Sequence, residues 1–250
     1  MEKINLFEMT RPEVEQAMAA GVDTVIIIAG STEQHGLHLP LGTDAIMGEA
    51  LGERVARALG NALLAPGLRI GCSEHHMDFA GSLTLRRETF IQMVADICRG
   101  VAHHGFRHIV LIPTHGGNFA PLASAVETIR SELPGVNLIA FTDLIAFMEE
   151  IFQTGKAFGV TPEKAGAHSG EFETSIMLSV RPDLVAIDQA QAGYVGDQLR
   201  IAPLLFEKGF RAVTANGVLG DPRDASAANG EAYMDAITDL LVGYIKEARS

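Results

Sequence analysis

Carboxylate and imidazole side chains follow the first strand pattern of the chain. Residues 25–29 read Val-Ile-Ile-Ile-Ala, and the loop after them carries Glu33, His35, His38 and Asp44. A buried strand that ends in a polar loop brings such groups to one place. Imidazole and carboxylate ligands without a thiolate suit Zn, Mn or Fe. We therefore expect a catalytic metal site at this strand end.

Two later segments offer further ligands. His115 follows a second strand pattern at residues 108–113, and Glu171 lies at the predicted start of a helix. Two histidines and three carboxylates suit two ions that share a bridging carboxylate and together activate water and polarise a carbonyl. The alternative for each residue alone is a hydrogen-bonding role in its loop. No GxGxxG or GxxxxGK[ST] phosphate-binding motif is present.

Apolar spacing and capping residues place helices between the strands. The expected strands are 25–29, 62–65, 108–113 and 136–141, with a brief one at 83–85. The expected helices are 10–20, 45–59, 88–104, 120–133, 144–154, 171–180 and a last one that ends near 245, after a loop at 217–230. This alternation indicates an α/β fold with a parallel sheet, in a single domain over residues 1–250. In such sheets ligands bind at the carboxyl ends of the strands.

Composition narrows the functional classes. The chain has 250 residues, 47% of them hydrophobic, and a net charge of −12, which excludes a nucleic-acid backbone as a partner. Cys72 and Cys98 form no CxxC pair, so neither a thiolate zinc site nor a disulfide framework is expected. No apolar run is long enough to span a membrane, and the first residues have no leader pattern. We expect a cytoplasmic protein with a small-molecule substrate.

Long motifs occur in order over nearly the whole chain. They are GSTEQHGLHLP at 30–40, TD at 43–44, HGGN at 115–118, HSGEFETS at 168–175 and GVLGDP at 217–222. In combination they resemble the creatininase (creatinine amidohydrolase) family. The resemblance implies a three-layer α/β/α sandwich with a mainly parallel central sheet, a dinuclear centre of two divalent ions (Zn, Mn or Fe) and a homohexamer.

The resemblance also implies roles for the metal ligands. By motif position Glu33 and His115 hold one ion, His35 holds the other, Asp44 bridges them and Glu171 completes the set. Creatininase proper has a carboxylate at the position of Gly117, which cannot ligate, and an apolar residue at the position of Glu171. His38 is left to structure the loop. Glu173, on a different helix face from Glu171, is expected to be buried or to support the ligands.

His168 matches the proton-transfer histidine of the family, and the alternative is that it only orients a ligand. His75, His76 and Asn118 are candidate substrate contacts, and the alternative for the two histidines is an ordinary surface loop. Arg86 and Arg87 are either contacts for an anionic substrate or a solvated helix start.

The chain contains no tryptophan. The family resemblance implies that tryptophans close the substrate site in creatininase proper. We therefore expect a substrate other than creatinine: a small, cyclic amide or related C–N compound, attacked at its carbonyl by a hydroxide that the metals hold. The alternatives are a formamidopyrimidine deformylase, a peptidase of mycofactocin maturation, a hydrolase that cleaves a C–C bond of a keto-inositol ring, and a metal-free small-molecule-binding domain.

Overall fold

A computed structural model describes residues 3–249, and their strands form a parallel sheet in the order β2-β1-β3-β4. The strands are β1 (Thr24–Ala29), β2 (Ala62–Leu64), β3 (His108–Pro113) and β4 (Asn137–Ala140). At the centre of the sheet, Thr24 pairs with Ala62 on one side and with His108 on the other. The parallel sheet predicted from the alternating pattern is confirmed.

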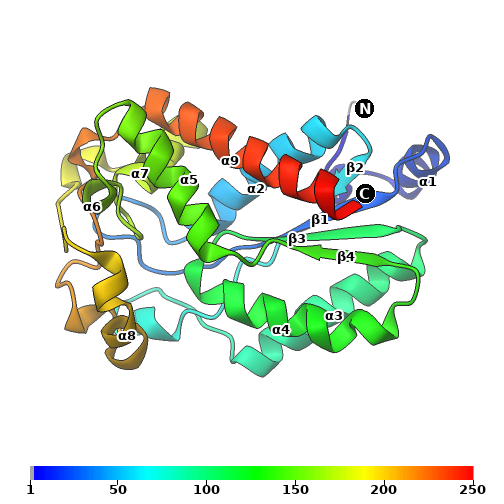
Figure 1. Cartoon of the computed structure of the whole chain (residues 1–250), viewed down its shortest axis with the longest axis horizontal. Coiled ribbons are helices and arrows are strands. Elements are labelled where there is room, and N and C mark those ends of the chain that lie inside the picture. The colour runs from blue at the N-terminus through cyan, green and yellow to red at the C-terminus, as the bar shows by residue number, and fades with distance from the viewer. Residues whose placement is uncertain (1–2, 250) are drawn as a thin grey trace.

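Helices cover both faces of this sheet (Figure 1). The helices are α1 (Arg11–Ala19), α2 (Thr43–Leu59), α3 (Arg87–His103), α4 (Phe119–Ile129), α5 (Leu144–Ala157), α6 (Pro162–Ala165), α7 (Glu171–Val180), α8 (Gln198–Lys208) and α9 (Ala227–Arg249). Helices α2, α5, α7 and α9 pack on one face, and α1, α3 and α4 pack on the other. The molecule is thus the expected three-layer α/β/α sandwich.

The uninterrupted apolar run of β1 reflects this double cover. Ile26 and Ile28 belong to the core beneath α2 and α9, while Val25 and Ile27 belong to the core above α3 and α4. All four side chains are buried, because successive residues of a strand point to opposite faces of the sheet.

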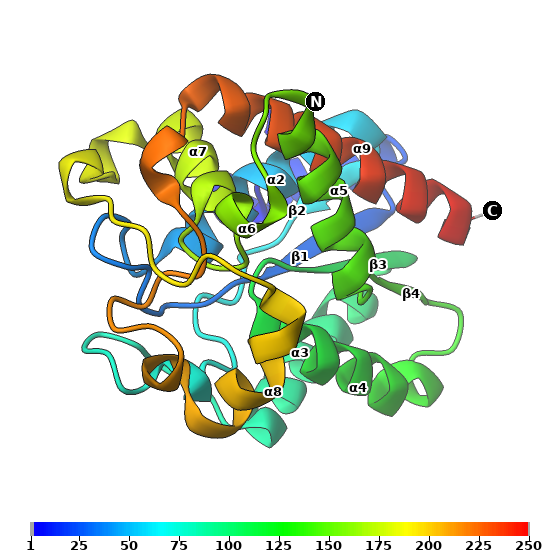
Figure 2. The ribbon, with the colours of Figure 1, turned by 60° about the vertical axis from the view of Figure 1, so that its left-hand side comes forward.

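The loop after β1 packs closely on the start of α2. A Cβ atom at Gly30 would lie 2.8 Å from Cα of Ala45, so only glycine allows this approach. The contact holds the chain after Gly30 beside the first turn of α2, where Asp44 lies. Strands β1 and β3 end on the side of the molecule where α6, α7 and α8 lie (Figures 1 and 2).

Three sequence predictions about these elements were wrong or incomplete. Residues 83–85 form no strand, and Leu83 makes a single backbone hydrogen bond to Thr32. Helix α9 begins at Ala227, inside the segment predicted as a loop. Helix α8 was not predicted, although the Asp197 carboxylate caps it by accepting from two backbone N–H groups. No helix within residues 3–249 is long and apolar enough to cross a membrane.

Candidate metal centre

The loops after β1 and β3 bring four of the predicted ligands together. Nε2 of His35 lies 3.1 Å from Oδ1 of Asp44, and Nδ1 of His115 lies 3.1 Å from Oε1 of Glu33. All four side chains are buried. They come from the carboxyl ends of neighbouring strands β1 and β3 and from the first turn of α2, as expected for a parallel sheet.

Asp44 lies between the two histidines. Its Oδ1 atom is 3.1 Å from Nε2 of His35, and its Oδ2 atom is 3.4 Å from Nδ1 of His115. Each carboxylate oxygen therefore faces a different imidazole. This is the arrangement in which one carboxylate can contribute an oxygen to each of two ions.

Backbone carbonyls orient both imidazoles. Nδ1 of His35 is 3.0 Å from the carbonyl oxygen of Glu33, and Nε2 of His115 is 3.1 Å from that of Cys72. A carbonyl only accepts, so these nitrogens donate, and the opposite nitrogen of each ring faces the cluster, where it can bind a metal once it has lost its proton. A hydrogen bond from the second ring nitrogen is the usual support of a metal-binding histidine.

Carboxylate oxygens of the cluster have no hydrogen-bond partner within residues 3–249. They are both oxygens of Glu33 and Oδ2 of Asp44, and all three are buried. The nearby imidazole nitrogens are close to them but not aligned as donors. A buried carboxylate oxygen without a hydrogen-bond donor is costly, and a bound cation would satisfy it. The donor set therefore fits divalent metal binding.

The metal-free cluster balances its charge with protons. Burial alone would lower the pKa of His35, but the charges of Asp44, Glu173 and Glu33 raise it to about 9. Burial would also lower the pKa of His115, whereas Glu33 and Asp44 raise it well above its ordinary value. A divalent ion would take the place of these imidazole protons.

The structure does not bring Glu171 into the cluster, contrary to the role predicted for it. Its Oε1 atom accepts hydrogen bonds from Ser175 (2.7 Å) and Asn229 (2.8 Å), and its Oε2 atom accepts one from Tyr233 (2.6 Å). Both oxygens are thus occupied on the side of α7 that faces α9. The carboxylate is buried as a structural hydrogen-bond acceptor.

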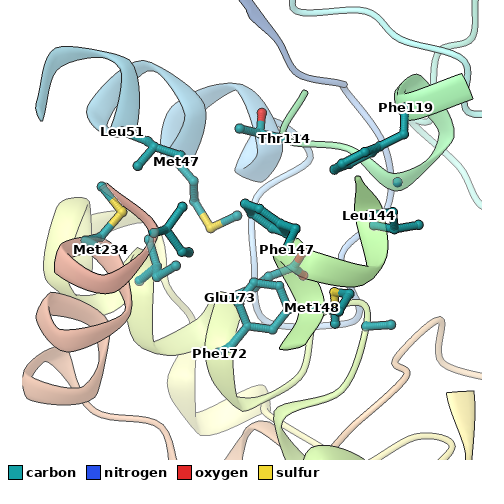
Figure 3. Close-up of a pocket in the computed structure, with 14 residues that line it drawn as sticks. Met47, Leu51, Thr114, Phe119, Leu144, Phe147, Met148, Phe172, Glu173 and Met234 are labelled. Atoms are coloured by element: carbon teal, nitrogen blue, oxygen red, sulfur yellow. The ribbon is translucent and has the colours of Figure 1, made fainter. Parts of the chain in front are cut away.

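Glu173 takes the place near the cluster. Its Oε2 atom lies 3.8 Å from Nε2 of His35 and accepts a hydrogen bond from the backbone N–H of Ser169. Figure 3 shows Glu173 on the wall of a small cavity, with Phe147 and Phe172 close to it. This burial raises the pKa of Glu173 to about 7. His35, His168 and Glu173 are close enough to hold one ion together.

His168 turns one ring nitrogen towards the cluster. Its Nε2 atom donates to the backbone carbonyl of Gln34 over 2.7 Å, so Nδ1 carries the lone pair, 3.8 Å from Oε1 of Glu33. Burial lowers the pKa of His168 well below its ordinary value, and the charge of His35 lowers it further. A neutral imidazole in this position can accept a proton or a metal ion.

His76 differs from His115 and His168 in the ring atom that it turns towards the cluster. The Gln34 side chain is fixed because its Oε1 accepts from the N–H of Gly36 and its Nε2 donates to the carbonyl of Gly217. The same Nε2 lies 3.1 Å from Nδ1 of His76, which must therefore accept. Nε2 of His76 then carries the ring proton and lies 3.1 Å from Oε1 of Glu33. His76 is buried beside Glu33, and its Nε2 atom is not aligned to donate to Oε1.

The remaining predicted contacts separate into two groups. His75 lines the cavity at the metal centre and stacks on His115 at 5.6 Å between ring centroids. Asn118 is fully buried, and its amide is occupied by backbone groups of Ala29, Gly30 and Cys72, so it pins the loops and does not reach a substrate.

Arg86 and Arg87 lie outside the lining of the cavity at the metal centre, and Arg87 donates to Ser124. Both are exposed at the start of α3, as the solvated-helix interpretation expected. His38 binds Thr174 through Nε2 at 2.8 Å and joins its loop to α7.

Three features of the site were missed in the sequence: the proximity of Glu173, the amide of Gln34 and the apolar residues of α8. The pattern Asp197 followed by Ile201, Ala202 and Leu205 signals a capped amphipathic helix and could have revealed α8. The choice of Glu173 over Glu171 had no local signal, because both are carboxylates in the first turn of α7.

Fold and site together define an α/β protein with a buried histidine–carboxylate cluster suited to divalent metals. The profile of the creatininase family, described as creatinine amidohydrolase, matches residues 7–245. A mycofactocin precursor peptide peptidase of Mycobacterium ulcerans (strain Agy99) is 33% identical over 230 residues, 89% of this chain and 84% of that protein. The creatinine amidohydrolase of Pseudomonas putida is 29% identical over 257 residues, 96% and 95% of the two chains.

A solved mutant creatininase of Zn-Zn type has the same fold, with a TM-score of 0.74, 26% identity and 98% of each chain covered. The chain belongs to the creatininase family. It is a hydrolytic enzyme, as the family resemblance of its motifs predicted.

Proposed function

We propose that the chain binds two divalent ions and hydrolyses an amide C–N bond at its carbonyl. The observation that carries the proposal is the position of Asp44, with one oxygen facing His35 and the other facing His115. In this assignment Glu33, His115 and Asp44 would hold one ion, and His35, Asp44 and Glu173 would hold the other. When bound, the ions supply an activated water and polarise the carbonyl.

His168 is the proton-transfer residue in this proposal. Its neutral ring is held by the Gln34 carbonyl, and its free Nδ1 atom faces the same space as the carboxylate of Glu33. A group in this position can take a proton from the attacking water and give it to the departing nitrogen. His76 lies beside Glu33, with its Nε2 atom 3.1 Å from Oε1.

The similarity to a peptidase and to a creatinine amidohydrolase supports an amide as the substrate, since both relatives are named for cleaving C–N bonds. We infer that linear amides, including peptide bonds, belong in the substrate screen beside cyclic ones. The screen uses protein loaded with Zn or Mn and detects released amine. Absence of amine from all amide substrates, together with formation of an acyclic acid from a keto-inositol, would replace the proposal by C–C hydrolysis.

The ion count has its own test. The Zn-Zn form of the related creatininase supports two ions and makes zinc the first metal to load. Mn and Fe fit the same nitrogen and oxygen donors. We expect two ions per chain by elemental analysis of the purified protein and fewer than one in Asp44→Ala, because the bridging carboxylate serves both positions. Retention of both ions by that variant would refute the bridge.

We also propose that the enzyme is a cytoplasmic homohexamer. The two unpaired thiols, Cys72 and Cys98, suit a reducing compartment, and the hexamer follows from the family resemblance. Sedimentation equilibrium measures the assembly directly, and a mass near that of one 26.7 kDa chain would contradict it.

A further inference from the structure

A cavity of about 410 Å³ opens on the metal centre between α5 and α8. Its lining includes Glu33, His115 and His168 together with apolar side chains of both helices. Figure 2 shows α5 and α8 on the side of the molecule where the loops after β1 and β3 lie. A substrate that reaches the metal centre through this cavity must pass between the two helices.

Large apolar side chains around the cavity are left in water. Leu199 of α8 is 80% exposed, Ile145 of α5 is 65% exposed and Phe206 of α8 is 58% exposed, and all three line the cavity. Single exposed apolar residues are ordinary on a protein surface. Three of them facing one space beside a catalytic cluster form an apolar patch of the kind that marks a binding site.

Aromatic side chains of the cavity lie directly against the histidines. The ring centroid of Phe210 lies 4.0 Å from that of His76 and 4.8 Å from that of His168. The ring centroid of Phe206 lies 4.9 Å from that of His75. A substrate with its carbonyl at the metal centre therefore places the adjoining group directly against aromatic and aliphatic side chains.

Charge and size restrict what this group can be. Among the described residues that line the cavity, the carboxylates are Glu33 and Glu149, and neither Lys nor Arg is present. A substrate carboxylate that lies away from the metal centre, between α5 and α8, would lose water without gaining a cationic partner. At roughly 30 Å³ per water, the volume equals about fourteen waters, which is more than one small polar ring fills.

We propose that the substrate carries a large uncharged apolar group, such as a phenylalkyl or branched alkyl chain, next to the carbonyl that is cleaved. Ile145, Leu199 and Phe206 hold this group between α5 and α8. The inference rests on the metal centre proposed above and names the class of amide that it serves.

Hydroxamates test the two proposals separately, because their metal-chelating group is constant while the attached chain varies. Calorimetry on the zinc-loaded protein compares acetohydroxamate, 3-phenylpropanohydroxamate and the monohydroxamate of succinate. We expect the phenyl compound to bind at least tenfold more tightly than acetohydroxamate, and the succinate compound to bind no more tightly. Equal binding of the methyl and phenyl compounds, or preference for the succinate compound, overturns the apolar assignment.

Failure of acetohydroxamate to bind at millimolar concentration would instead contradict the proposed metal centre, and the proposed apolar site would be rejected with it.

Variants of the cavity wall test which residues cause the preference for the phenyl compound. Leu199→Asp and Phe206→Asp should each cut the ratio of phenyl to methyl affinity at least fivefold. Leu204→Asp is the matched control, since Leu204 is 44% exposed on the same helix but does not line the cavity. An equal loss in all three variants would contradict the assignment.

Discussion

The phenol of Tyr233 on α9 donates a hydrogen bond of 2.6 Å to Oε2 of Glu171 on α7. This bond, with those from Ser175 and Asn229, turns Glu171 away from the histidine cluster and ties two core helices together. Two residues along α7, Glu173 points the other way, towards His35. The proximity of Glu173 to His35 and the packing of α7 on α9 therefore have the same structural cause.

The two carboxylates of α7 should respond differently to removal of their charge. Glu173→Gln should lower the zinc content from two ions to about one, because the amide is a poor ligand beside His35. Glu171→Gln should keep both ions and lose only stability. Elemental analysis and thermal unfolding measure the two effects, and loss of metal in Glu171→Gln with full occupancy in Glu173→Gln would reverse the assignment.

Removal of the Tyr233 hydroxyl should destabilise the protein without affecting the metal centre. In Tyr233→Phe, one oxygen of the buried Glu171 loses its donor, which costs about 1–3 kcal/mol of the free energy of unfolding. Denaturant titration measures this change. The variant should bind metal as the unchanged protein does, and a coupled loss of zinc would mean that Glu171 acts at the metal centre.

His168→Gln should separate catalysis from metal binding. The new amide nitrogen can still donate to the carbonyl of Gln34, but no proton acceptor replaces Nδ1. We expect the turnover number on the substrate found by screening to fall by about 10²–10⁴ while both ions remain. His104→Gln, on the exposed end of α3, is the control. Loss of an ion in His168→Gln would make His168 a ligand.

Metal affinity should rise with pH. The pKa of His35 is raised to about 9, and that of His115 is raised well above its ordinary value. Both rings therefore carry a second proton at neutral pH in the metal-free protein. A cation must displace these protons, so the dissociation constant should fall about tenfold per pH unit for each proton released, and the contribution of His35 should end near pH 9. Competition with a chelator between pH 6 and 9 measures the slope, and a flat profile would contradict this charge balance.

Gly117 should tolerate no side chain, whereas its neighbour should. A Cβ atom at Gly117 would lie 2.2 Å from the carbonyl oxygen of Cys72 and 2.5 Å from Nε2 of His115. Gly117→Ala should therefore displace His115 and lower the zinc content. Gly116→Ala is the matched control, because its Cβ atom would meet nothing within 4 Å. Equal zinc content in both variants would show that the loop adapts.

The sequence by itself determined the sheet and the location of the chemistry. The β-branched run of β1 requires cover on both faces, and parallel strands end at one edge, so Glu33, His35, Asp44 and His115 were predictable from their place after strands. These inferences needed only local patterns and the regular geometry of α/β folds.

The tertiary structure alone decided which carboxylate of α7 faces the histidines. Residues two apart on a helix point to nearly opposite sides, so the rotation of α7 about its axis selects between Glu171 and Glu173. That rotation is set by contacts with α9, more than 50 residues further along the chain, including the Tyr233 hydrogen bond. The cavity between α5 and α8 could not be predicted either, because it is formed by the packing of two helices that are far apart in the sequence.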